Sequence, residues 1–214
     1  VGYNSGHDRA MELIAGLAGE GHYALPVRLE DSATAKAAAI EIGERYGRCD
    51  ILVNSAGFTR PIPHKDLDAL DDATFDAVLI ANVRGPFAMI RALAPLLRKS
   101  DDGVVVNISS ISAFTGSGSS IAYCAAKAAL DTMTVSLARA LGPEIRLLCV
   151  SPSAVATDFV AGRDRAAVAK LAEATPLKRI TEAEDVARAV MACVTHLRNA
   201  TGTRIVLDAG RSLM

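Results

Sequence analysis

Short, unbroken apolar runs alternate along this chain with longer segments of helical period, and this alternation constrains the fold more than any other feature. Val104–Ile108 has the length of a strand, and similar runs lie at 25–29, 51–53, 145–150 and 204–207. Segments expected to be helical separate them, at 7–18, 32–45, 74–97 and 122–141. Because most of these runs are unbroken rather than alternating, both faces of each strand should be covered. The pattern predicts parallel β-α-β units with right-handed crossovers, hence an α/β fold with a doubly wound parallel sheet in three α/β/α layers.

The composition fits one domain with a large core and no nucleic-acid partner. The chain has 214 residues, of which 50% are hydrophobic and only 4% aromatic, so small aliphatic side chains should fill the interior. The 23 basic and 24 acidic residues give a net charge of −1. No cluster of Lys and Arg provides the basic surface that nucleic-acid binding requires.

The cysteines and the apolar stretches indicate a soluble cytoplasmic protein without a structural metal. The four cysteines are scattered, with no C-x-x-C pair, which argues against a disulfide framework and a zinc site. The apolar stretches are shorter than the roughly 20 residues of a membrane span. The chain does not start with the basic and then apolar pattern of a signal peptide.

A Ser, a Tyr and a Lys in the second half of the chain suggest a proton-transfer site. Ser110 follows the strand expected at 104–108, so it should lie at the carboxyl edge of the sheet, where open parallel sheets bind ligands. Tyr123 and Lys127 are four residues apart on the helix expected at 122–141, so both project from one face. The ammonium should lower the pKa of the phenol from about 10 towards neutrality, making Tyr123 a general acid/base. Taken alone, the Y-x-x-x-K spacing also arises by chance, and a role as hydrogen-bonding residues at a strand end is the alternative for Ser109 and Ser110.

Further segments occur in a fixed order around this group. They are Asn54-Ser55-Ala56-Gly57, Asn82-Val83-Arg84-Gly85-Pro86-Phe87, Asn107-Ile108-Ser109-Ser110, Ser151-Pro152-Ser153-Ala154-Val155-Ala156-Thr157-Asp158 and Thr201-Gly202 through Asp208-Ala209-Gly210. Together they resemble the signatures of the short-chain dehydrogenase/reductase family over essentially the whole chain. The resemblance implies a single Rossmann-like domain over residues 1–214. It also implies NAD(P)-dependent hydride transfer between a nicotinamide cofactor and a small-molecule carbonyl or secondary alcohol.

The resemblance assigns roles to the matched positions. Tyr123 would protonate the carbonyl during reduction, or act as the base in the reverse direction, and Ser110 would orient the substrate oxygen. Lys127 would hold the nicotinamide ribose and tune Tyr123. Asn82 would kink its helix and hold a water that relays protons. Besides Tyr123 and Lys127, the expected cofactor-binding residues are Asn4, Arg28, Leu29, Asn54, Ala56, Gly57, Pro152, Val155 and Thr157.

Several positions depart from the family pattern. The glycine-rich T-G-x-x-x-G-x-G turn that seats the pyrophosphate is absent, so we expect a strand, this turn and a helix to precede Val1. Arg28 stands where the family usually has an Asp beside the adenine, and it is equally well explained as a solvated surface residue. Ser153 and Ser55 replace a Gly and an Asn of the pattern.

The cofactor is expected to be NADP(H), with NAD possible. An acidic residue at the end of the second strand of the family fold would bind the ribose hydroxyls of NAD and repel a 2′-phosphate. Here that position is Tyr3, followed by Asn4 and Ser5, with no carboxylate before Asp8.

Substrate and assembly are less constrained by the sequence. A 3-oxoacyl-carrier-protein-type reductase is one alternative, and a catalytically silent nucleotide-binding subunit is another. The family places a mobile lid at 158–175, where Phe159 and Val160 would give an apolar lining. The apolar face of the helix at 122–141 is broad, and in the family this helix pairs across a two-fold axis. We therefore expect a homo-oligomer, a dimer or a homotetramer.

Overall fold

The computed structural model describes residues 1–214 and contains two parallel sheets. The strands are β1 (Gly2–Tyr3), β2 (Leu25–Pro26), β3 (Ile51–Asn54), β4 (Gly103–Ile108), β5 (Ile145–Pro152) and β6 (Thr203–Leu207). β1 pairs with β2, and the larger sheet has the order β3-β4-β5-β6. All of the predicted apolar runs are strands, although the run at 25–29 is a strand only over its first two residues.

Helices connect successive strands, as the parallel order requires, and one 3₁₀ turn follows the last strand. They are α1 (His7–Ala15), α2 (Ser32–Tyr46), α3 (Asp72–Leu79), the π-helical turn η1 (Ile80–Arg84), α4 (Gly85–Leu97), α5 (Ser112–Thr115), α6 (Ile121–Leu141), α7 (Arg165–Glu173), α8 (Ala183–Thr195) and the 3₁₀ turn η2 (Arg211–Leu213). Side-chain caps explain where several begin: Asp31 accepts a hydrogen bond from the N–H of Ala33, and Ser120 accepts one from that of Tyr123.

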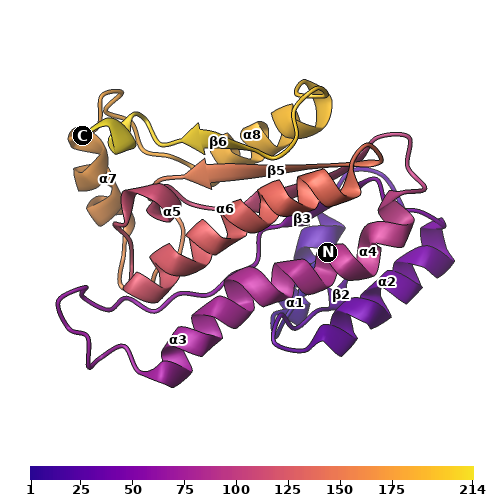
Figure 1. Ribbon diagram of the computed structural model, residues 1–214, viewed down its shortest axis with the longest axis horizontal. Coiled ribbons are helices and arrows are strands. Elements are labelled where there is room, and N and C mark those ends of the chain that lie inside the picture. The colour runs from indigo at the N-terminus through magenta and orange to yellow at the C-terminus, as the bar shows by residue number, and fades with distance from the viewer.

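The two faces of the larger sheet are covered by different helices, which confirms the doubly wound α/β fold. On one face, Val105 and Leu147 pack with residues of α4 and α6, and α2, α4 and α6 run side by side over this face (Figure 1). On the other face, Val104 and Leu148 pack with Cys193 of α8. Adjacent residues of a strand point to opposite faces, so covering both faces accounts for the unbroken apolar runs.

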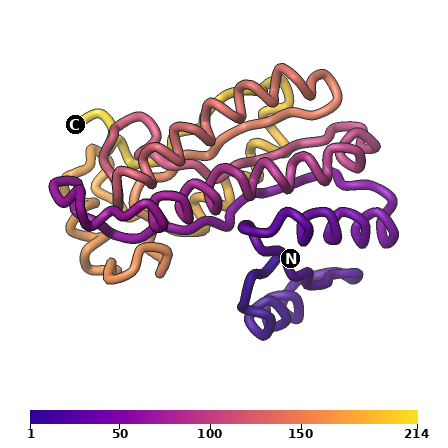
Figure 2. Tube along the Cα trace, turned by 60° about the horizontal axis from the view of Figure 1, so that its bottom comes forward, coloured from indigo at the N-terminus to yellow at the C-terminus, as the bar shows by residue number.

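The two sheets are not hydrogen-bonded to each other, and the β3 side of the larger sheet is incompletely covered. Ile51 and Val53 are 46% and 40% exposed, whereas Leu52 between them is buried against α4. Figure 2 shows the N-terminal elements set apart from the body of the molecule. A β-branched side chain on a strand normally packs against a helix layer, so this region resembles an uncovered part of the core.

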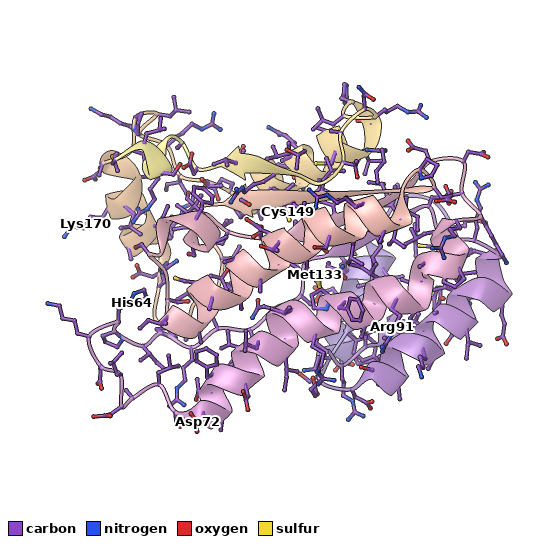
Figure 3. The ribbon with its side chains drawn as sticks, viewed as in Figure 1. His64, Asp72, Arg91, Met133, Cys149 and Lys170 are labelled. Carbon is purple, nitrogen blue, oxygen red and sulfur yellow. The ribbon has the colours of Figure 1, made fainter.

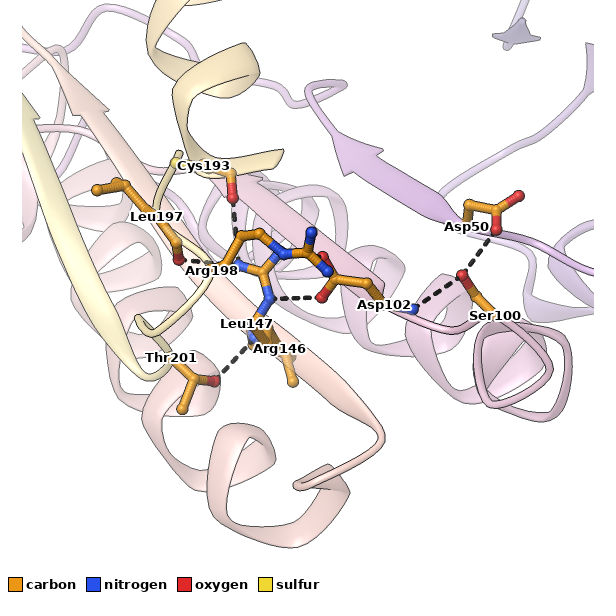
Figure 4. A network of polar contacts seen from close by, with 9 residues as sticks. All are labelled: Asp50, Ser100, Asp102, Arg146, Leu147, Cys193, Leu197, Arg198 and Thr201. Carbon is orange, nitrogen blue, oxygen red and sulfur yellow. Dashed lines mark hydrogen bonds and ion pairs between the residues drawn. The ribbon is translucent and has the colours of Figure 1, made fainter. Parts of the chain in front are cut away.

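A polar network joins the amino ends of the strands (Figure 4). Arg146 of β5 makes a bidentate ion pair with Asp102, with Nε–Oδ1 at 2.9 Å, and donates to the carbonyls of Cys193 and Leu197 at 3.2 and 3.1 Å. Arg198 approaches the same carboxylate at 3.4 Å. The network therefore fixes the end of α8 to the loop that precedes β4.

One helical run meets the length and composition of a membrane span, which the apolar stretches of the sequence did not suggest. Asp72–Leu97 forms a continuous run of 26 residues through α3, η1 and α4, and half of its most apolar window is buried inside the protein. The core helices of soluble proteins pass the same test, so the run carries little weight as evidence for a membrane segment.

Candidate active site

Ser110, Tyr123 and Lys127 line one cavity of about 1360 Å³ at the carboxyl edge of the larger sheet. Ser110 follows the end of β4, and the N-terminal half of α6 carries the other two residues. The i, i+4 spacing places phenol and ammonium on one side of α6, with Lys127 Nζ 5.5 Å from the centroid of the Tyr123 ring. The structure thus brings together the three residues that the sequence selected.

Lys127 is fixed in place at the floor of this cavity. It is 5% exposed, and its Nζ donates a hydrogen bond to the carbonyl of Ile108 at 2.8 Å. Burial lowers the pKa of Lys127 to about 8, while the charge of Asp131 opposes the shift. The ammonium therefore titrates close to physiological pH.

The pKa of Tyr123 moves in the direction opposite to the one expected from its spacing to Lys127. Burial raises this pKa to about 12, and the Ser110 hydroxyl and the charge of Arg163 only partly oppose the rise. Desolvation penalises the phenolate more than the neighbouring cations favour it. The expectation of a near-neutral pKa was wrong for this structure. At pH 7 Tyr123 is a neutral phenol, the form that donates a proton.

Asn82 lies behind the cavity in η1, where the α-helical hydrogen-bond pattern is interrupted. Its Nδ2 donates to the carbonyl of Phe58 at 2.6 Å and to that of Val78 at 2.9 Å. Its Oδ1 is buried without a hydrogen-bond partner and faces Gly57, where a Cβ would lie only 2.7 Å away. A buried, unpartnered acceptor is the kind of group that an ordered water satisfies.

Of the cofactor-binding residues expected on β3, on β5 and in the loops after them, some line the cavity and others do not. Gly57, Pro152, Val155 and Thr157 line the same cavity as Tyr123. Asn54 does not, because its Nδ2 donates to Asn107 Oδ1 at 2.8 Å. The pleat explains the difference: Asn54, like Leu52, points to the buried face of β3. Ala56 is exposed in the loop after β3 and is not among the residues that line the cavity.

The three expected contacts near the N-terminus lie outside this cavity. Arg28 pairs with Asp31 at 3.0 Å, so a hydrogen-bond partner within the chain already occupies its guanidinium. Leu29 packs against Gly85 of α4, where a Cβ would come within 2.7 Å of the Leu29 side chain. Asn4 is exposed in the turn after β1. If these residues contact a ligand, they contact a portion of that ligand that lies far from Tyr123.

The segment after β5 adds residues that sequence reasoning found only in part. Phe159 and Val160 line the cavity, as the proposed lid implied, and the Phe159 ring is 6.0 Å from that of Tyr123. Arg163 and Arg211 also line it, and the sequence did not single them out. No motif includes them, because they are far apart in the chain and meet only in the folded protein.

The whole chain is similar to known proteins. The family model described as Enoyl-(Acyl carrier protein) reductase matches residues 2–212. Ketoacyl reductase 2 of the granaticin polyketide synthase of Streptomyces violaceoruber is 38% identical over 173 residues, or 80% of this chain and 69% of the relative. The 3alpha-hydroxysteroid dehydrogenase of Mediterraneibacter gnavus is 33% identical, over 86% of this chain and 74% of the relative.

The chain belongs to the short-chain dehydrogenase/reductase family. A solved short-chain dehydrogenase/reductase from Burkholderia xenovorans superposes with a TM-score of 0.91 at 33% identity, covering 100% of this chain and 87% of the other. As a short-chain dehydrogenase/reductase, the protein is an NAD(P)-dependent oxidoreductase. Its own residues fit such a cofactor, since the cavity extends from Gly57, where a Cβ would come within 2.7 Å of Asn82 Oδ1, past Tyr123 to Thr157.

Proposed function

We propose that this enzyme interconverts a carbonyl and a secondary alcohol with NADPH as its cofactor, and that Tyr123 is the acid/base. The observation that carries the proposal is the convergence of Ser110, Tyr123 and Lys127 on one cavity with the expected nicotinamide-binding residues. The bound cofactor supplies or accepts the hydride. In reduction, the neutral phenol of Tyr123 donates a proton to the carbonyl oxygen, which the Ser110 hydroxyl holds in place.

The neighbouring residues support this proton transfer. Lys127 holds a positive charge beside the phenol, which stabilises the phenolate left after the proton has moved. Asn82 offers its unpartnered Oδ1 to a water on the route between Lys127 and solvent. Gly57, Pro152, Val155, Thr157 and Lys127 would hold the nicotinamide end of the cofactor.

The loop after β1 supports NADP(H) as the cofactor. Tyr3 ends the strand, and the first carboxylate, Asp8, is exposed and contacts His7 at 3.2 Å. Arg9 lies over the turn, with Nη2 2.9 Å from the position that a Cβ of Gly6 would occupy. A cation beside this turn, with the first carboxylate five residues beyond Tyr3, would favour a 2′-phosphate.

We further propose that a strand and a glycine-rich turn ahead of Val1 complete the domain between β1 and β3. The support is the missing hydrogen bonding between the two sheets and the exposure of Ile51 and Val53. Fluorescence titration with NADPH and NADH should compare the product of the complete gene with residues 1–214. The complete protein should bind NADPH more tightly than NADH, and the shorter chain should bind neither. A preference for NADH would contradict the reading of the β1 turn.

Replacing Tyr123 by Phe tests the acid/base role. Removal of one hydroxyl should lower kcat by at least about a hundredfold, within the range that general acid catalysis contributes. NADPH affinity and the melting temperature should change little, since the ring remains to contact Phe159. A fully active Phe variant would show that another group transfers the proton.

The 3-oxoacyl reductase alternative gains support from the names of two relatives. One is the ketoacyl reductase above, and another is the 3-oxoacyl-[acyl-carrier-protein] reductase FabG of Thermotoga maritima, which is 30% identical over 79% of this chain. Turnover of a 3-oxoacyl thioester, measured beside simple ketones, distinguishes this variant from a general carbonyl reductase.

We also propose that the enzyme is a homo-oligomer, a dimer or tetramer, and that it works in the cytoplasm. Phe87 of α4 and Val135 of α6 are exposed on neighbouring helices, which supports a shared interface there. All four cysteines are free, as a reducing compartment requires. A monomer in light scattering of the complete protein would refute the assembly.

A further inference from the structure

Arg163 and Arg211 are cations of the active-site cavity that have no counter-ion. Arg163 lies between β5 and α7, and Arg211 begins η2 after β6. Both are half-buried and both line the cavity that contains Tyr123. Neither guanidinium makes an ion pair or a side-chain hydrogen bond, and the terminal carboxylate of Met214, which also lines the cavity, pairs with neither. Elsewhere in the protein, Arg146, which is 12% exposed, pairs with Asp102, and the more exposed Arg204 pairs with Asp131.

The charged side chains that line the cavity are all positive. Its charged side chains are Lys127, Lys170, Arg163 and Arg211, and no Asp or Glu contributes to the lining. Lys127 is bonded to the Ile108 carbonyl, and Lys170 is exposed on α7 at the outer edge of the molecule (Figure 3). The two arginines therefore supply the cationic character of the interior. Two like charges that are partly removed from water are unfavourable unless an anion binds between them.

The arginine pair lies beside the reacting centre. Arg163, Arg211 and Tyr123 line the same cavity, and burial, followed by the charge of Arg211, lowers the pKa of the Arg163 guanidinium. Phe159, four residues earlier on the same segment, has its ring 6.0 Å from that of Tyr123. The residues expected near the adenosine end of the cofactor belong to β1, β2 and the loops after them, and Figure 1 shows β2 and α1 well away from α7 and the C-terminus. An anion at this pair would therefore belong to the substrate.

On the basis of the proposed carbonyl reductase activity, we propose that Arg163 and Arg211 bind a carboxylate of the substrate, so that the enzyme acts on oxo acids and the matching hydroxy acids. In reduction, bound NADPH would supply the hydride to the carbonyl carbon and would leave as NADP⁺. The π bond opens, and the carbonyl oxygen takes the proton of the Tyr123 hydroxyl. The carboxylate is not consumed, and its contacts with the two guanidiniums hold the carbonyl against Tyr123 and Ser110.

The test compares oxo acids with their neutral methyl esters on the complete protein. The pairs 3-oxobutanoate, 4-oxopentanoate and 5-oxohexanoate, each with its methyl ester, span a range of distances between the ketone and the charge. The wild-type enzyme should prefer at least one acid over its ester by about tenfold or more in kcat/KM, as charge-assisted hydrogen bonds predict. Equal kcat/KM for acid and ester in all three pairs would overturn the proposal.

Variants of the two arginines test whether these residues cause the preference for the acid over its ester. Arg163→Met and Arg211→Met should each lower kcat/KM for the preferred acid about tenfold more than for its ester, through KM more than kcat. Arg163→Lys should keep part of the preference because it keeps the charge. Lys170→Met removes an exposed cation from the rim of the cavity and should leave the ratio of acid to ester unchanged. A loss that is equal for acid and ester would refute the assignment.

Two measurements separate this proposal from its alternatives. If the arginines bind a phosphate of the cofactor instead, the methionine variants will raise the KM for NADPH and leave the ratio of acid to ester unaltered, which overturns the proposal. If neither acids nor esters are reduced, the proposed reductase function fails for these ketones. Calorimetric titration of the same acids into the protein with NADP⁺ then decides the anion site. Binding that Arg163→Met weakens about tenfold supports it, and no binding refutes it.

Discussion

Replacing Arg146 by Met should destabilise the protein without impairing its chemistry. Arg146 is 12% exposed, and its guanidinium donates hydrogen bonds to Asp102 and to two backbone carbonyls at the end of α8. Met has a similar length and keeps the apolar contacts of the side chain, so the substitution isolates the loss of the charged donors. The network lies at the amino ends of the strands (Figure 4). The cavity with Tyr123 lies at the carboxyl ends.

The expected loss follows from the contacts that disappear. Hydrogen bonds to a charged group contribute about 1.5–3 kcal/mol, and the lower end applies because Asp102 is 30% exposed. Each of the two carbonyls loses a donor, at about 1 kcal/mol or less, because water reaches this edge of the protein. Arg198 still faces Asp102 and replaces part of the ion pair. The free energy of unfolding should therefore fall by about 3 kcal/mol, which lowers Tm by roughly 6–12 °C for a chain of this size.

Arg198→Met provides the matched control. Its side chain is 70% exposed and makes one contact with the same carboxylate, between Arg198 Nε and Asp102 Oδ2 at 3.4 Å. An exposed ion pair of this kind contributes at most about 1 kcal/mol. Urea unfolding followed by circular dichroism should rank the two variants, and kcat/KM of both at 25 °C should match the wild type.

The pH dependence of stability provides an independent check that the loss of the Arg146–Asp102 interaction causes the destabilisation. The hydrogen bond from Arg146 lowers the pKa of Asp102 in the folded protein. A depressed carboxyl pKa stabilises the fold at pH values above the unfolded pKa of about 3.9, and this stabilisation is lost as the pH falls through the folded value. The difference between wild type and Arg146→Met should thus shrink below about pH 4. Equal losses for the Arg146 and Arg198 variants at pH 7 would refute the reasoning.

Two further substitutions address the active site. Gly57→Ala places a Cβ 2.7 Å from Oδ1 of Asn82, whose amide is held by two hydrogen bonds, so kcat/KM should fall at least about tenfold and stability by about 1–3 kcal/mol. Gly43→Ala is its control, since the new Cβ meets a leucine at 3.5 Å, and unchanged kinetics are expected there. Asp131→Asn removes a charge that raises the pKa of Lys127, so the alkaline limb of the pH profile of kcat/KM should move to lower pH. A limb that stays in place would show that Lys127 does not control it.

The strand–helix alternation was enough to predict the layers of the fold. Unbroken apolar runs such as Val104–Ile108 require cover on both faces, and α4, α6 and α8 provide it. The predicted boundaries of helices and strands were less accurate where the sequence has no clear hydrophobic periodicity. The run at 25–29 contains Pro26 and yields only a short strand, and α8 was not predicted.

The grouping of the proposed catalytic residues was predictable because its geometry is local. Tyr123 and Lys127 share a helix face through their spacing, and Ser110 follows the strand that leads to the same edge of the sheet. Asn54 shows the limit of this reasoning. Its motif was visible, but the pleat of β3 turns the side chain towards Asn107 and away from the cavity.

The sequence by itself determined the fold class, the family and the residues available for proton transfer, because periodicity and spacing along the chain encode them. The tertiary structure decided the electrostatics. Burial raises the pKa of Tyr123 to about 12, and desolvation depends on every element packed around a group, not on its neighbours in sequence. The fold also brought Arg163 and Arg211 to one cavity from loops at the ends of different strands. No local sequence pattern predicts that these two residues line one cavity, because their placement results from the order of the strands in the sheet.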